Sequence, residues 1–152
     1  SKWHDEAVAE MEKTRTALNG RPVWITAGSV LKPFGLARAL LCAGFNVEAI
    51  VAQMAIAPDR DALNWILENH PEVNIIQPQH VNVIDFNHRS EDAVAIGFDS
   101  AYIAGASRVV SIVNDAGMFG YMGVVRLMQM IRESAAHPED LKQLIDDYGV
   151  VI

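Results

Sequence analysis

Three short polar pairs hold the side chains best suited to bind a ligand: Gly28-Ser29, Asp99-Ser100 and Asn114-Asp115. Each pair follows a short apolar run that predicts a buried strand. Because the carboxyl ends of parallel strands meet at one edge of an open α/β sheet, we expect the three pairs to lie together there. Their hydroxyl, amide and carboxylate groups could hydrogen-bond a ligand, but they specify no reaction.

Two further residues extend this candidate binding site. Lys32 follows the first pair at the start of a predicted helix, where backbone N–H groups favour an anion, and Gly97 ends the strand before the second pair. The turn after the first strand is neither GxGxxG nor a P-loop, so an ordinary strand-to-helix turn is the alternative. Gly120 and Gly123 either admit a ligand close to the backbone or only relieve crowding between helix and sheet.

No side chain is assigned to catalysis or to a metal. The five histidines are scattered and show no HxxxH or HExxH spacing, and no nucleophile–base pattern is present. Cys42, the only cysteine, lies in the apolar run of a predicted helix, where we expect a buried and unreactive thiol. One thiolate cannot hold an iron–sulfur cluster, which takes several.

The composition is typical of a globular protein of one domain. The chain has 152 residues, of which 51% are hydrophobic and 20% charged, enough to bury a core. The net charge of -7 without a basic cluster argues against nucleic acid as a partner, and no apolar run reaches the roughly 18 residues of a membrane span. A single cysteine excludes an internal disulfide and fits the cytoplasm. Because the chain opens on Ser1 and ends on an apolar tail, we expect a domain excised from a longer protein.

Alternating apolar runs and amphipathic stretches predict the elements that position the polar pairs. Strands are expected at 23–26, 45–51, 73–76, 93–97 and 109–113, and helices at 34–42, 58–69, 100–106, 121–134 and from Pro138. A first helix ends near Asn19-Gly20 and is expected to pack on something outside the sheet. The ambiguous residues 78–89 are assigned a short, poorly formed helix.

This alternation predicts a three-layer α/β/α, Rossmann-like domain over residues 1–152, with a mostly parallel sheet of about five strands. Between the second and third strands, Asp59 or Asp61 is expected to favour the positive end of the helix that they begin. The carboxyl edge of such a sheet is where open α/β proteins bind their ligands.

Four sequence features occur in a fixed order along the chain. Gly20-Arg21-Pro22-Val23 begins the first strand, Ala43-Gly44-Phe45-Asn46-Val47 joins a helix to the second, Ile96-Gly97 turns after the fourth, and a glycine pair opens the long helix. In this order they resemble the carboxyl-terminal Rossmann-like domain of nitrogenase component 1 proteins. That family includes the nitrogenase subunits, the cofactor-assembly scaffold and the related tetrapyrrole reductases. The likeness runs from Trp3 to Ser134 and covers only the last third of such a protein.

The resemblance implies a domain of a nitrogenase-like component 1 oxidoreductase that forms one wall of a metallocluster or substrate cavity. The full-length protein would hold an iron–sulfur or related metallocluster and would bind a sister subunit and a reductase component. For the fragment alone we expect no cofactor and no activity. The family's cluster-cradling turn corresponds to the neighbourhood of Lys32. The family's histidine ligand falls near Val110 or Ile112, which cannot bind a metal, so a paralogue or assembly factor fits better than dinitrogen reduction.

Two other functions stay open. The chain could be an isolated nucleotide- or phosphate-binding α/β module, although it lacks the glycine fingerprint of such modules. It could also be a structural domain for subunit pairing, which the first helix and the apolar tail favour. The residues alone do not identify a substrate.

Overall fold

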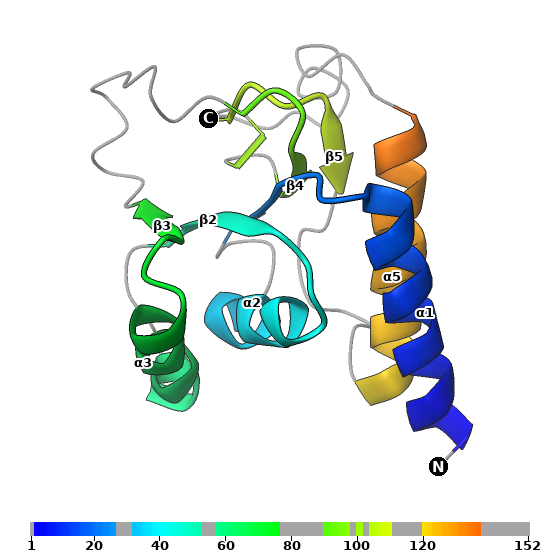
Figure 1. Cartoon of the computed structure of the whole chain (residues 1–152), viewed down its shortest axis with the longest axis horizontal. Coiled ribbons are helices and arrows are strands. Elements are labelled where there is room, and N and C mark those ends of the chain that lie inside the picture. Colours follow the sequence, from blue (N-terminus) through cyan, green and yellow to red (C-terminus); the bar gives the residue numbers. More distant parts are fainter. Residues whose placement is uncertain are drawn as a thin grey trace.

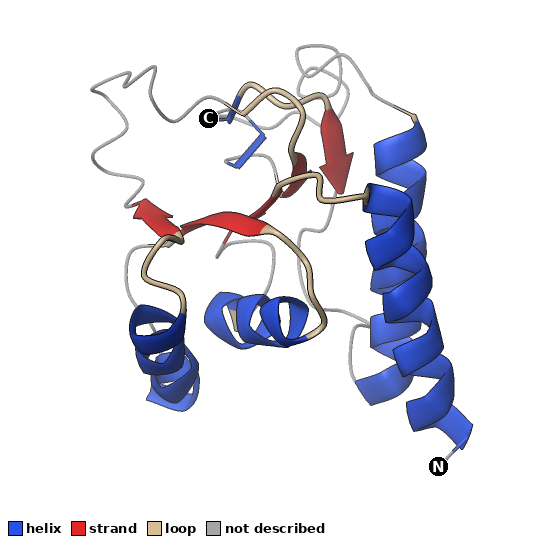
Figure 2. Ribbon diagram, in the orientation of Figure 1, coloured by secondary structure: helices blue, strands red, loops and turns tan. Residues whose placement is uncertain are grey.

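A computed structural model of the chain describes residues 2–26, 32–52, 57–76, 90–97, 100–101, 104–110 and 120–137. Within these ranges, five strands form one all-parallel sheet flanked by helices (Figures 1 and 2). This architecture confirms the predicted α/β, Rossmann-like fold. The predicted helices at 78–89 and from Pro138 lie outside the described residues.

All five predicted strands are present in the sheet. They are β1 (Val23–Thr26), β2 (Val47–Val51), β3 (Asn74–Ile76), β4 (Val94–Ile96) and β5 (Arg108–Val110). Every residue of β1 and β4 is buried. Strands that are apolar on both faces form when a sheet is covered on both sides, which explains why these runs do not alternate between apolar and polar residues.

The described helices agree closely with the predicted ones. They are α1 (Lys2–Leu18), α2 (Pro33–Cys42), the 3-10 turn η1 (Ala57–Asp59), α3 (Arg60–Asn69) and α5 (Gly120–Ala136). Ser100, Ala101 and Ala104 are also helical, in the short segment between β4 and β5. The alternation of strand and helix that the sequence predicts is therefore confirmed for the described part of the chain.

The strand order marks a position at the carboxyl edge of the sheet where a ligand site is expected. The sheet runs β3-β2-β1-β4-β5, so the chain extends from β1 to one side and then returns to the other side through β4. The order therefore reverses between β1 and β4, where Ile25 lies beside Ile96. In open α/β sheets, the crevice outside the carboxyl ends of two such strands is the usual ligand site.

Two hydrophobic clusters cover the two faces of the sheet. The larger one joins the sheet to α2, α3 and α5 and includes Ile25, Phe34, Ile50, Ile66 and Ile131. The smaller one gathers Trp24 with alanines of the sheet and of the segment after β4, among them Ala49, Ala95, Ala101 and Ala104. Figure 2 shows α2 and α3 together on one side of the sheet and the short helical segment on the other. The small alanine side chains let that segment approach the strands closely.

Helix α1 forms an outer layer against α5. The two helices lie side by side and run in the same direction (Figure 1). Helix α1 buries Ala7, Thr14 and Leu18, whose spacings of seven and four residues place them on one face of the helix. The sequence prediction that the first helix packs outside the sheet is confirmed, since its partner is α5.

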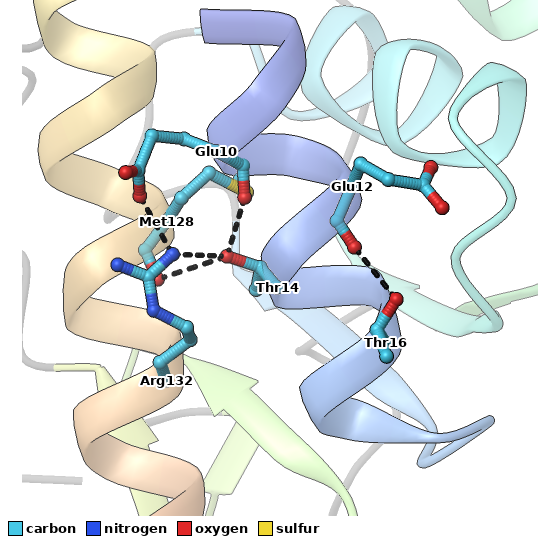
Figure 3. A network of polar contacts seen from close by, with 6 residues as sticks. All are labelled: Glu10, Glu12, Thr14, Thr16, Met128 and Arg132. Atoms are coloured by element: carbon cyan, nitrogen blue, oxygen red, sulfur yellow. Dashed lines mark hydrogen bonds and ion pairs between the residues drawn. The ribbon is translucent and has the colours of Figure 1, made fainter. Parts of the chain in front are cut away.

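A small polar network fixes the register of α1 against α5 (Figure 3). Arg132 Nη1 lies 2.7 Å from Glu10 Oε2 in an ion pair and donates a hydrogen bond of 2.8 Å to Thr14 Oγ1. The Thr14 hydroxyl is fully buried, and it lies 2.9 Å from the carbonyl oxygen of Glu10 and 3.4 Å from that of Met128. Buried polar groups need such partners, so the network favours one alignment of the two helices.

Candidate functional site

The point where the strand order reverses is closed by two buried hydroxyl groups. Thr26 ends β1, and Ser100 begins the helical segment after β4. Thr26 Oγ1 lies 2.5 Å from Ser100 Oγ and also accepts the backbone N–H of Ser100 at 3.0 Å. Both residues are almost wholly buried, with exposed fractions of 4% and 0%. The pair therefore joins the ends of β1 and β4 at the place where a ligand is expected.

Hydroxyl chemistry leaves one hydrogen of this pair available. Each hydroxyl has one hydrogen to donate, and the O–H···O bond between Thr26 and Ser100 uses one of the two. Thr26 Oγ1 also accepts a hydrogen bond from the backbone N–H of Ser100, so the two hydroxyls together accept two hydrogen bonds and donate one. The second hydrogen is left for a further acceptor, which can be a carbonyl oxygen or a ligand atom. Among the described residues, the site thus has donor character, and they form no nucleophile–base arrangement there.

Gly97 sets the turn that brings Ser100 to this position. Its φ of +104° lies in the left-handed region that glycine adopts readily and other residues rarely. The Gly97 N–H donates to the carbonyl oxygen of Val110 at 3.0 Å, and its carbonyl accepts the N–H of Ala101 at 3.2 Å. Gly97 therefore lies at the carboxyl edge as predicted. Its hydrogen bond to Val110 also links the end of β4 to the end of β5.

The start of α2, the other part of the predicted site, is already occupied by a side chain of the protein. Asp59 accepts the Phe34 N–H on Oδ2 at 2.9 Å and the Gly35 N–H on Oδ1 at 2.7 Å. Pro33 has no N–H, and the Leu36 N–H bonds to the carbonyl oxygen of Lys32 at 3.0 Å. The first-turn donors that could bind an anion here are therefore all used.

Asp59 has a role that the sequence does not predict. The sequence predicts that Asp59 or Asp61 favours the start of α3, and Asp61 does lie in its first turn, whereas the Asp59 side chain, at the N-cap position, makes no capping hydrogen bond there. The 3-10 turn η1 places its carboxylate against α2 instead. The sequence gives only a weak signal of this role: a proline at the start of α2 and an aspartate two elements later. The signal is weak because the contact between them depends on how the elements pack.

Lys32, Gly97 and Ser100 are the predicted site residues that the structure places. Gly97 and Ser100 lie together at the β1–β4 edge, whereas Lys32 is exposed at the N-terminus of α2. The other predicted site residues lie outside the described part of the chain: Gly28, Ser29, Asp99, Asn114 and Asp115. Sequence reasoning missed Thr26 because it was assigned only to a strand. A hydroxyl residue that ends an otherwise apolar strand was the available signal.

The sheet edge is therefore the main guide to function. No family model, curated protein or solved structure matches the chain.

Neither a metal centre nor a membrane span is found in the described part of the chain. Within those residues, no three His, Cys, Asp or Glu side chains are grouped so that they could hold a metal ion. Among the described helices, none combines the length and apolar character needed to cross a bilayer.

The prediction of a buried Cys42 is wrong, because the residue is exposed at the end of α2. Helix α2 directs Phe34, Ala37 and Leu40 toward the core, and a residue two positions beyond Leu40 falls on the opposite face. Since α2 runs back from the carboxyl edge, its last residue lies at the other end of the sheet from the β1–β4 edge.

Proposed function

We propose that this chain is a domain of a nitrogenase-like component 1 oxidoreductase of the cytoplasm. Its carboxyl sheet edge forms one wall of a metallocluster or substrate cavity in the full-length protein. A sister component 1 type subunit and a reductase component are the proposed partners. The sequence resemblance names the family, and the reversal of strand order between β1 and β4 is the structural observation that supports a cavity at this edge.

The described residues at the β1–β4 edge are better suited to line a cavity than to bind the iron atoms of a cluster. At the β1–β4 edge they supply the hydroxyls of Thr26 and Ser100 and the backbone of Gly97. The one thiol of the chain is exposed at the other end of α2. Hydroxyl and backbone N–H groups can hydrogen-bond a bound group and orient it, whereas iron–sulfur clusters are held by thiolates, which the described residues do not supply at this edge.

Binding of a nucleotide or phosphate is not the function that the geometry favours. Such ligands place a phosphate against the free N–H groups at the start of the helix after the first strand. In this chain the N–H groups of Phe34 and Gly35 already bind the Asp59 carboxylate. This contact counts against the alternative function without affecting the proposed cavity at the β1–β4 edge.

The proposal can be tested on the full-length gene product. The protein is produced without oxygen, alone and together with its sister subunit, and its iron and acid-labile sulfide are measured alongside its electron paramagnetic resonance spectrum. We expect stoichiometric iron and sulfide with a cluster spectrum. A correctly folded full-length protein without iron would contradict the proposal, as would reductant-dependent turnover by the 152-residue chain alone.

A wall residue should also affect the cluster differently from a ligand. In the full-length protein, Ser100→Ala removes a hydroxyl at the edge but no metal ligand. We expect the iron content to be retained and the spectrum or substrate affinity to change. Loss of the iron with the fold intact would assign Ser100 a ligand role and would contradict the proposed one.

A further inference from the structure

Asp59 is a buried carboxylate with an unusual set of partners. Its exposed fraction is 1%, and both of its oxygens accept backbone N–H groups of α2, from Phe34 and Gly35. Among the described residues, no Lys, Arg or His side chain forms an ion pair with it. A carboxylate in such a place must be compensated by hydrogen bonds, and here backbone donors provide them.

The local electrostatics favour a negative charge at this point. Asp59 immediately precedes α3, while its side chain meets the first turn of α2. The N-termini of both helices therefore contribute partial positive charge close to one carboxylate. An anion is stabilised in this position, and the protein supplies that anion itself.

Gly35 makes the close approach possible. A Cβ atom at this position would lie 3.1 Å from Asp59 Oδ1, which is tighter than most contacts of real Cβ atoms. Glycine inside a helix is less favourable than alanine, so its presence at the third residue of α2 needs a reason. Space for the carboxylate supplies one, and it indicates that the contact is built into the start of α2.

We propose that Asp59 is a built-in anion that determines specificity. It occupies the position where Rossmann-like domains receive the phosphate of a nucleotide or sugar phosphate, and it satisfies the same backbone donors. The domain therefore excludes phosphorylated ligands at the start of α2. This inference does not depend on kinship with component 1 proteins, because it concerns only the start of α2.

Removing the carboxylate should convert the closed position into an anion site. Asp59→Ala frees the N–H groups of Phe34 and Gly35, and the loss of a helix cap should lower the melting temperature by roughly 2–8 °C. Inorganic phosphate is then added at constant ionic strength, maintained with sodium chloride. We expect a saturable recovery of about half of that loss in Asp59→Ala, because an anion that binds only the folded state stabilises it.

The controls separate this effect from general salt effects. Asp61→Ala removes an exposed carboxylate from the first turn of α3, and phosphate should change its melting temperature no more than that of the wild type. In the wild type, amide nuclear magnetic resonance signals of Phe34 and Gly35 should not respond to phosphate. Saturable shifts of these two signals in the wild type would overturn the proposal.

A second variant covers the case in which Asp59→Ala does not fold. Asp59→Ser keeps a short hydroxyl acceptor for one N–H but removes the charge and part of the side-chain volume, so it should fold and should respond to phosphate more than the wild type. Folded Asp59→Ala or Asp59→Ser protein that gains no more from phosphate than the wild type would contradict the inference. Neither result involves the iron content, so failure here is distinct from failure of the proposed function.

Discussion

The hydroxyl oxygens of Thr26 and Ser100 lie 2.5 Å apart although the residues are 74 positions apart in the chain. Thr26 belongs to the half of the sheet that continues into β2 and β3, and Ser100 to the half that continues into β5. Their hydrogen bonds therefore join the two halves at the reversal of strand order. The same contact defines the candidate site and holds the sheet together at its carboxyl edge.

Replacing Thr26 with valine tests the energetic value of this contact. The change keeps the shape of the side chain but leaves the Ser100 N–H without its acceptor in a fully buried place. Leaving a buried donor unsatisfied costs about 1–3 kcal/mol, so we expect the free energy of unfolding to fall by that amount. Guanidinium denaturation followed by circular dichroism measures the difference.

Thr16→Val provides the matched control for this variant. Thr16 is an exposed residue of α1 whose hydroxyl bonds only to a carbonyl of its own helix, so its replacement should change stability by less than about 0.5 kcal/mol. Adding Ser100→Ala to Thr26→Val removes the second hydroxyl but not the unpaired N–H, and only a small further loss is expected. Equal losses for the variants at positions 26 and 16 would show that the contact contributes nothing.

The ion pair between α1 and α5 should matter most when it is broken on one side. Arg132→Met leaves the Glu10 carboxylate, which is only 20% exposed, without its cation, and Thr14 without a donor. We expect a loss of about 1–3 kcal/mol in the free energy of unfolding, measured by urea denaturation. Arg126→Met, at an exposed position of the same helix, should lose far less.

A double variant distinguishes the loss of the attraction between Arg132 and Glu10 from the cost of leaving the Glu10 carboxylate buried without a cation. In the Arg132→Met background, Glu10→Gln removes the unpaired carboxylate and should recover part of the lost stability. A further loss of stability in the double variant would mean that Glu10 stabilises the helix contact independently of Arg132.

Gly44 should tolerate a side chain less well than Gly20. Both have positive φ angles, +89° and +82°, so alanine at either position should cost about 1–2 kcal/mol of backbone strain. At Gly44 a Cβ atom would also lie 2.9 Å from Cδ of Arg15, whereas at Gly20 nothing lies within 4 Å. Because this atom belongs to a flexible and partly exposed side chain that can shift, thermal unfolding should show only a slightly larger loss for Gly44→Ala. In an Arg15→Ala background the difference should vanish, and its persistence would refute the steric explanation.

The fold was predictable because its signals are local. Apolar runs bounded by Gly20, Gly44 and Gly97 identify strands and turns from neighbouring residues alone. Cys42 shows where local reasoning fails, since the apolar run that contains it does not define which face of α2 is buried. The inward face was determined by packing against the sheet, which the sequence pattern does not specify there.

The details of the site were less predictable, because its contacts link distant residues. Asp59 caps a helix that begins 26 residues before it, and the choice between α2 and α3 depends on the turn at η1. Gly97 and Ser100 could be placed at the edge from their position after a strand. Thr26 ends an apolar strand, but that Ser100 is its partner follows only from the pairing of β1 with β4.

The exposed pair of Glu12 and Arg15 on α1 predicts a small effect of pH. The hydrogen bond from Arg15, and then its charge, hold the pKa of the Glu12 carboxyl below its ordinary value of 4.5. A carboxyl whose pKa is lower in the folded state stabilises the fold above its unfolded pKa, and this contribution is lost as the pH falls through the folded pKa.

In Arg15→Gln, the pKa of Glu12 should rise, as measured by titration of its side-chain carbon signal. The stability difference between wild type and Arg15→Gln should shrink as the solution is acidified and in high salt, because both treatments weaken an exposed ion pair. An unchanged Glu12 titration in the variant would show that Arg15 does not interact with this carboxylate in solution.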